Sequence, residues 1–149
     1  MKTKFLLTVA IAAIAAGVIT WTIQNKTDIK PNFKELWLEQ AELKVEIVDT
    51  PKNRAAGLGG RKSLPQDQGM FFVFEQSDVY PFWMKDMRFP LDIIWMDSDY
   101  KVVDLIQDVK PDSYPNSIVP EKSALYVLET NSGWIKENNI KIGSQAFLK

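Results

Sequence analysis

The sequence predicts a mainly β domain of the α+β class, a compact antiparallel sheet or half-open barrel with two short helices, preceded by an N-terminal hydrophobic helix. Short apolar runs of strand length, alternating or continuous, recur along the chain. Gly, Pro, Asn and Asp separate these runs at short intervals, as in antiparallel sheets and barrels. After the first apolar segment, no long amphipathic helix pattern follows. We therefore expect one β-rich domain over residues 35–149.

Residues 1–24 have the pattern of a signal anchor or a signal peptide. Lys2 and Lys4 precede the charge-free run Phe5–Ile23, which is close to the lower length limit of a membrane-spanning helix, roughly 17–25 residues. Trp21 suits a membrane interface. The two lysines predict a cytoplasmic N-terminus and an extracytoplasmic C-terminal domain anchored to the membrane. A secreted or periplasmic protein, released by signal cleavage, is the alternative.

The elements that follow can be placed from the apolar runs and the turn residues. Residues 25–34 are polar and contain a proline, which predicts a tether. A helix is expected from Pro51 to about Leu58, because Thr50 can cap it and proline suits the first helical position. A second short helix is expected through Trp134–Glu137, with Asn131 or Ser132 as its cap. Strands are expected at 35–38, 43–48, 70–74, 81–84, 91–96, 102–109, 124–129 and 145–148.

The segment Gly57–Ser63 is rich in glycine and contains a lysine, but it does not fit a phosphate-binding loop. Arg61 stands where that motif needs the glycine that precedes its lysine, and no strand leads directly into the segment. The glycines are therefore interpreted as the end of the first helix.

Composition excludes several chemistries. The chain has no cysteine and no histidine, which excludes thiolate chemistry, Ser-His-Asp catalysis and the usual zinc sites. No metal site and no cofactor are predicted, and no transition metal is expected, since the remaining oxygen ligands suit magnesium or calcium better. After residue 27 there are 15 basic and 19 acidic residues, a balance of −4. This charge does not favour a nucleic-acid partner.

From Leu43 to the C-terminus, a series of blocks resembles the family called domain of unknown function 192. The blocks are Arg54-x-x-Gly57-Leu58-x-x-Arg61, Gly69–Phe74, Phe82–Lys85, Pro90–Ile94, Tyr126–Glu129 and Gly133. The resemblance implies a small, often exported, β-rich protein with no established activity. The chain departs from the family pattern at Asp86-Met87, where Asn-Thr is usual, and at Gly59, where a methionine is usual.

Five residues form the candidate ligand-binding site: Arg61, Trp83, Lys85, Asp86 and Asp92. An aromatic ring beside acids and amides suits a glycan or a small anion. The structural alternative is a buried ion pair between Arg61 and Asp92, because Asp92 lies within an apolar strand and a buried charge needs a partner. For Trp83, core and binding surface are equally consistent with the sequence.

These residues leave three functional hypotheses. The favoured one is a binding or accessory domain of the cell envelope, whose partners are the membrane and a glycan, a small ligand or an envelope protein. The second is a hydrolase of envelope glycan that uses Asp86 and Asp92 as its two carboxylates. The third is a structural partner of another envelope protein. The sequence assigns no catalytic residue, and acids this close in sequence are common without catalysis, so an enzyme is less favoured.

Overall fold

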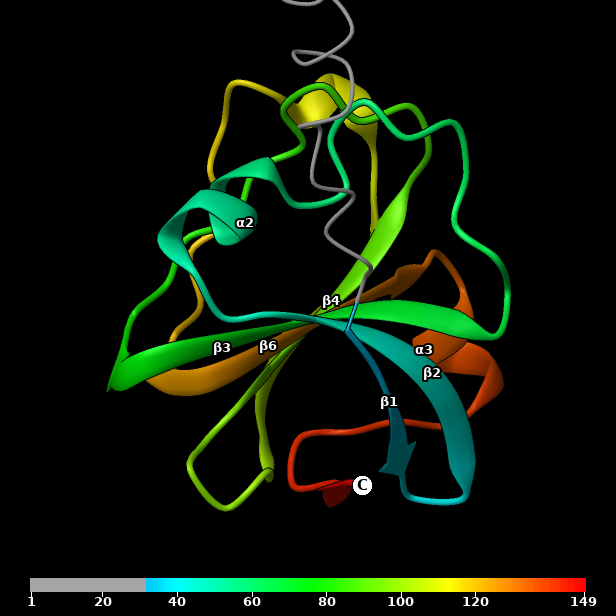
Figure 1. The fold of residues 1–149 in the computed structure, drawn as a ribbon, viewed down its shortest axis with the longest axis vertical. Coiled ribbons are helices and arrows are strands. Elements are labelled where there is room, and N and C mark those ends of the chain that lie inside the picture. Colours follow the sequence, from blue (N-terminus) through cyan, green and yellow to red (C-terminus); the bar gives the residue numbers. More distant parts are fainter. Residues whose placement is uncertain (1–31) are drawn as a thin grey trace, which may run out of the picture. The chain divides into compact units, whose positions relative to one another are not determined.

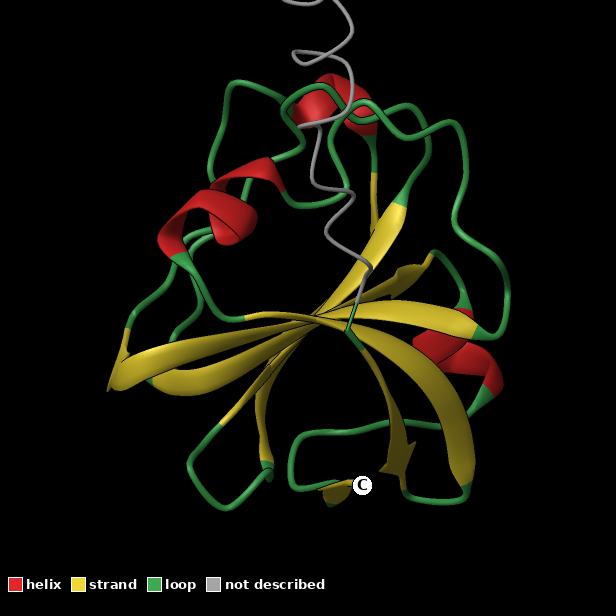
Figure 2. Cartoon of the chain, viewed as in Figure 1, coloured by secondary structure: helices red, strands yellow, loops and turns green. Residues whose placement is uncertain are grey.

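The computed structural model describes residues 32–149, in which seven strands form one curled sheet, a half-barrel (Figures 1 and 2). The strands are β1 (Phe33–Leu38), β2 (Ala41–Val48), β3 (Gln68–Asp78), β4 (Leu91–Met96), β5 (Val102–Val109), β6 (Ala124–Asn131) and β7 (Ala146–Leu148). Their order across the sheet is β5-β4-β6-β3-β2-β1-β7. All neighbours are antiparallel except β2 and β3, and a parallel pair needs a crossover, which here contains α2 (Pro51–Ala56). The predicted mainly β half-barrel with two short helices is confirmed for residues 32–149.

The expected membrane segment, residues 1–24, and the tether up to residue 31 lie outside the described residues. Within 32–149, no helix has the length and apolar character that a membrane span requires. The first strand begins at Phe33, two residues before its expected start. The expected strand at 81–84 is wrong: only Phe82 pairs, in an isolated bridge with Ile118.

Side chains alternate between the two faces of the sheet, and each face has its own apolar cluster. The α3 face, named for the helix α3 (Trp134–Glu137), buries Phe71, Ile94 and Leu128 together with Trp134 and Ile135 of that helix. The α2 face carries the next residue along each of these strands or the one before it. Its buried apolar residues include Met70, Phe72, Ile93, Trp95, Val127 and Leu58, the last from the turn after α2. Both faces are therefore covered, but by different elements.

The first helix confirms the capping prediction. The Thr50 hydroxyl accepts a hydrogen bond from the Asn53 N–H at 3.3 Å, and Pro51 begins the helix. It ends at Ala56, because Gly57 takes a φ of +49°, which favours glycine.

The predicted cap of the second helix is wrong. Gly133, not Asn131 or Ser132, is the N-cap residue of α3, and it has no side chain to cap with. The cap comes instead from Asp92 on β4, whose Oδ2 accepts hydrogen bonds from the Gly133 N–H at 3.1 Å and the Ile135 N–H at 2.9 Å. The residue that caps α3 is therefore 41 positions away from Gly133 in sequence, whereas local sequence predicts a cap from a neighbouring residue.

Candidate ligand pocket

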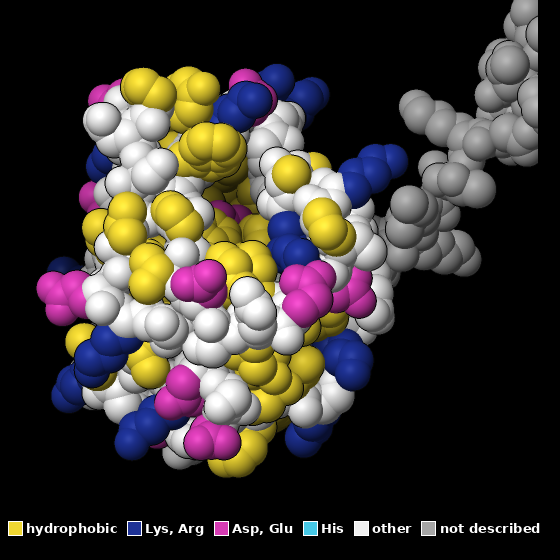
Figure 3. Space-filling model, turned by 90° about the vertical axis from the view of Figure 1, so that its left-hand side faces the viewer, with side chains coloured by type: hydrophobic (Ala, Val, Ile, Leu, Met, Phe, Trp, Pro, Cys, Tyr) yellow, Lys and Arg dark blue, Asp and Glu magenta, His cyan; other side chains and the backbone are white. Residues whose placement is uncertain are grey.

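A pocket of about 870 Å³ opens on the α2 face. Three parts of the chain enclose it: α2 with the glycine turn after it, the aromatic residues of β3, and residues 80–88. Figure 3 shows a hollow in the surface lined largely by hydrophobic side chains, with acidic atoms visible inside it. Its volume lies in the range of pockets that bind small organic molecules, about 300–1,000 Å³.

Aromatic side chains hold residues 80–88 against the sheet. The Phe82 ring meets Phe72 edge-on, with centroids 4.9 Å apart, and meets Trp95 edge-on at 6.0 Å. Tyr80 stacks on Phe74, and its carbonyl accepts a hydrogen bond of 3.0 Å from the Trp95 indole N–H. Such ring pairs stabilise beyond the area that they bury. The part of this wall that Tyr80 and Phe82 form is therefore apolar and held against the sheet.

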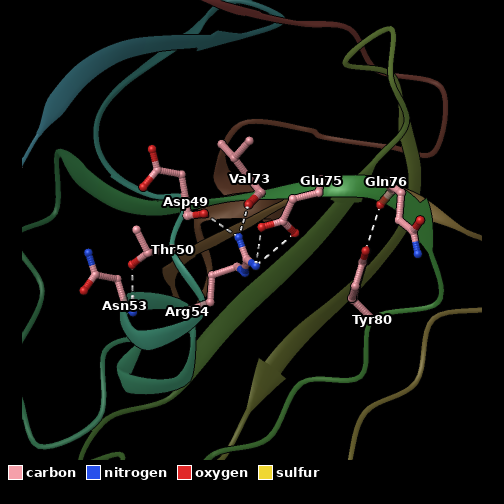
Figure 4. Close-up of polar contacts among 8 residues, drawn as sticks. All are labelled: Asp49, Thr50, Asn53, Arg54, Val73, Glu75, Gln76 and Tyr80. Carbon is pink, nitrogen blue, oxygen red and sulfur yellow. Dashed lines mark hydrogen bonds and ion pairs between the residues drawn. The ribbon is translucent and has the colours of Figure 1, made fainter.

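Arg54 joins α2 to β3, which form another part of the pocket wall (Figure 4). Its Nη1 donates to the carbonyl oxygens of Asp49 at 2.6 Å and Val73 at 2.8 Å. Its Nη2 lies 2.9 and 3.0 Å from the two carboxylate oxygens of Glu75. The guanidinium also lies over the Phe74 ring. A planar group with five donors suits this combination, which a lysine could not reproduce.

The glycine turn after α2 packs directly against the backbone of residues 85–86. The Gly60 N–H donates to the Asp86 carbonyl at 2.9 Å. A Cβ on Gly59 would lie 3.2 Å from the Lys85 carbonyl oxygen, so a side chain there would force the two segments apart. These glycines therefore bring two pocket walls together, in addition to ending the helix.

Glu129 of β6 completes the pocket lining and is a candidate site residue that sequence reasoning missed. Its side chain is buried, with the residue only 5% exposed, and its Oε2 has no hydrogen-bond partner. Burial raises the pKa of the Glu129 carboxyl to about 8, although the positive charge of Arg61 acts in the opposite direction. This shift favours the protonated form of the carboxyl group in the pocket at neutral pH. One signal in the sequence could have indicated Glu129: it is an acid that directly follows the apolar run Ala124–Leu128.

Three of the five residues predicted for the site line this pocket: Trp83, Lys85 and Asp86. Trp83 is 54% exposed, so it belongs to the surface and not to the core. Its ring meets that of Tyr114 edge-on at 6.4 Å. Arg61 and Asp92 are not among the lining residues.

The expected ion pair between Arg61 and Asp92 is wrong. Arg61 forms a two-point pair with Glu46 of β2, with N–O distances of 2.8 and 3.1 Å. Asp92 is fully buried on the α3 face, where backbone N–H groups supply its partners: Gly133, Ile135 and also Asp108, at 2.8 Å. The argument that a buried charge needs partners was correct, but the partners are peptide groups and not a cation.

The same arrangement removes the basis of the two-carboxylate hydrolase. Asp86 lines the pocket, whereas Asp92 projects from the other face of the sheet and is occupied with α3. Two acids on opposite faces cannot act on one glycosidic bond. Among residues 32–149, no three acidic side chains gather into a group that could hold a metal ion.

The fold and the pocket define a class: a small β half-barrel with one aromatic pocket that contains a buried acid. The chain belongs to DUF192, a family described as uncharacterized ACR, whose model matches residues 35–147. The resemblance seen in the sequence is thus confirmed. The family has no established activity, and no curated protein matches the chain.

Two solved structures share this fold. One, from Sinorhizobium meliloti 1021, carries a provisional description as a transcription regulator; it is 26% identical, with a TM-score of 0.77 over 81% of this chain and 97% of that one. The other is a protein of unknown function from Novosphingobium aromaticivorans DSM 12444, 25% identical, with a TM-score of 0.75 over 81% of this chain and 89% of that one.

Proposed function

We propose that this protein is a binding domain of the cell envelope that holds a small, largely apolar organic molecule in the α2-face pocket. The observation that carries the proposal is Glu129, a buried carboxyl group with an unpartnered oxygen in an aromatic pocket. Buried polar groups are almost always hydrogen-bonded, and an exception at a pocket wall favours a site at which a bound molecule supplies the missing partner.

The N-terminal sequence supports the proposed place of action. The apolar run Phe5–Ile23 after two lysines supports a signal anchor, with the pocket-bearing domain on the outer side of the membrane. Carbonate extraction of membranes, and protease digestion of intact cells, test this. Retention in the membrane pellet and digestion from outside are expected; release of a shortened chain would instead show cleavage of a signal peptide.

Two other functions have less support. A nucleic-acid role, which the description of the Sinorhizobium protein suggests, conflicts with the acidic balance of this chain after residue 27. A protein partner is the better alternative, because Trp83, Tyr114 and Val119 are exposed hydrophobic residues.

A pair of tryptophan variants on α2 tests pocket binding. Ala55 is exposed and lines the pocket, whereas Lys52 is exposed on the same helix and does not line it. In calorimetric titrations of 2-naphthamide into the full-length protein in detergent, the wild type and Lys52→Trp should bind. Ala55→Trp should not, because its indole fills the mouth. Equal heats from all three proteins would reject the pocket as the binding site.

A further inference from the structure

We propose that the pocket selects organic anions with a ring-shaped apolar body: Lys85 and Arg88 hold the anionic group at the mouth, and Glu129 donates a hydrogen bond to an acceptor at the other end. This inference rests on the proposed function and specifies its ligand.

The mouth has an excess of positive charge. Lys85 and Arg88 are exposed lining residues, and neither forms an ion pair with any of the described residues 32–149. Arg54 also lines the pocket, but Glu75 neutralises it at 2.9 Å. Asp86 is the acidic residue on the same loop. Two cations against one anion at the entrance favour a ligand with a negative group there.

The inner end has one polar function among apolar groups. Across the strands, Glu129 lies opposite Met70 of β3 and Ile93 of β4. A protonated carboxyl group has one O–H donor, and Oε2 has no acceptor within the protein. A ligand carbonyl or ether oxygen at this point would supply the acceptor, and the aromatic rings between would contact its apolar body.

The other charged groups around Glu129 do not change this assignment. From β2 and the turn after α2 come Glu46 and Arg61, which pair with each other at 2.8 Å. From β3 and α2 come Glu75 and Arg54, which also pair. The loop supplies Lys85, Asp86 and Arg88, and β4 presents Ile93, while its acid Asp92 faces the other way. No neighbouring carboxylate therefore competes for the Glu129 proton.

Binding should depend on pH. Below pH 7 the Glu129 carboxyl keeps its proton, because burial holds its pKa at about 8. Above its pKa, the Glu129 carboxyl group becomes a carboxylate. A carboxylate has no hydrogen to donate, and it repels both the acceptor oxygen and the anionic group of the ligand. Between pH 6.5 and 9.5 the protonated fraction, and with it the apparent affinity, should fall about 30-fold.

The test titrates 6-acetyl-2-naphthoate, which has a carboxylate at one end and a ketone at the other, into the full-length protein in detergent. Two analogues each lack one feature: 6-acetyl-2-naphthamide has no charge, and 6-ethyl-2-naphthoate has no acceptor. At pH 6.5 the first compound should bind at least tenfold more tightly than either analogue.

Variants then assign the two ends. Glu129→Gln keeps a donor but does not titrate, so its affinity should be the same at pH 6.5 and 9.5. Lys85→Gln and Arg88→Gln should weaken the naphthoates several-fold and leave the naphthamide unchanged. Lys52→Gln, which removes a charge from α2 outside the pocket lining, should leave all three affinities unchanged.

The outcomes separate this inference from the proposed function. If the naphthamide binds as tightly as the naphthoate, with no pH dependence, the ligand assignment fails while pocket binding stands. If 6-(aminomethyl)-2-acetylnaphthalene binds better than the naphthoate, and more tightly as pH rises, Glu129 receives a cation and the assignment is reversed. If no naphthalene compound binds, the proposed function fails with it.

Discussion

Two buried carboxyl groups lie on neighbouring strands, but one is fully hydrogen-bonded and the other is not. Asp92 of β4 is paired across the sheet with Thr130, and the next pair along is Ile93 with Glu129. The one-residue offset sends the two acids to opposite faces. On the α3 face, the start of α3 and the β5 backbone supply three N–H donors to Asp92. On the α2 face, aromatic side chains surround the pocket and Glu129 has an oxygen without a partner.

This difference separates structural acids from functional ones. An acid with its hydrogen-bonding capacity filled by backbone groups holds the fold together, and it has nothing left for a ligand. An acid left unsatisfied at a pocket wall destabilises the fold when it ionises, and natural proteins keep such groups at functional sites. The following predictions test that contrast.

The largest effect is expected at Asp92. Asp92→Ala leaves three backbone N–H groups without an acceptor and opens a cavity in a fully buried site. The free energy of unfolding should fall by about 5 kcal/mol, since each orphaned donor costs about 1–3 kcal/mol. Urea denaturation followed by tryptophan fluorescence measures it. A loss below about 1 kcal/mol would show that Asp92 is not the acceptor that holds α3.

Unlike Asp92→Ala, Glu129→Gln should raise the free energy of unfolding, but only at high pH. In the wild type, the pKa of Glu129 is about 8 in the folded state against 4.5 as its ordinary value, so the unfolded chain loses its proton first. The contribution of the neutral Glu129 carboxyl group to stability is therefore complete below pH 4.5. From there to about pH 8, the free energy of unfolding of the wild type falls by about 1.4 kcal/mol per pH unit. At pH 9 the variant should be more stable than the wild type by roughly 5 kcal/mol, at about 1.4 kcal/mol for each unit between the two pKa values.

The control for this prediction is Glu121→Gln, which removes an exposed acid far from the pocket lining. It should follow the wild-type pH profile throughout. A Glu129→Gln profile that parallels the wild type from pH 5 to 9 would mean that Glu129 is ionised in the folded protein.

The smallest effect is expected at Arg61, and its value lies in the pairing that it reveals. Arg61→Ala should cost about 1 kcal/mol, because the side chain is 39% exposed and its pair with Glu46 is partly solvated. In double-mutant cycles, Arg61→Ala should couple with Glu46→Ala, and should be additive with Asp92→Ala within about 0.5 kcal/mol. Coupling with Asp92 instead would restore the pair that the sequence suggested.

The sequence predicted the fold well where local physics decides it. The Thr50-Pro51 start of α2 and the alternating strands depend on nearest neighbours, and both were found as expected. Residues 81–84 looked like a strand because they are aromatic, but those rings pack into a pocket wall.

Part of the pocket lining could be predicted, for a physical reason. Trp83, Lys85 and Asp86 are adjacent in sequence and reach the pocket together. Glu129 reaches it only through the pairing of β6 with β3, which no local pattern specifies. The same limitation misassigned Arg61, whose partner Glu46 is 15 residues away on β2. Contacts between elements that are distant in sequence decided both cases.

The last strand has a consequence for how the chain folds. β7 pairs with β1, and Leu36 lies opposite Leu148, so the sheet joins residues from the two ends of the domain (Figure 1). Contacts between residues that are distant in sequence slow folding, because the entropy cost of closing a long loop comes before the contact that stabilises it. Until residues 146–148 arrive, β1 has an unpaired edge, which is open to association with other chains. Folding on a time scale of milliseconds to seconds is therefore expected, with the partly made sheet as the species most exposed to aggregation.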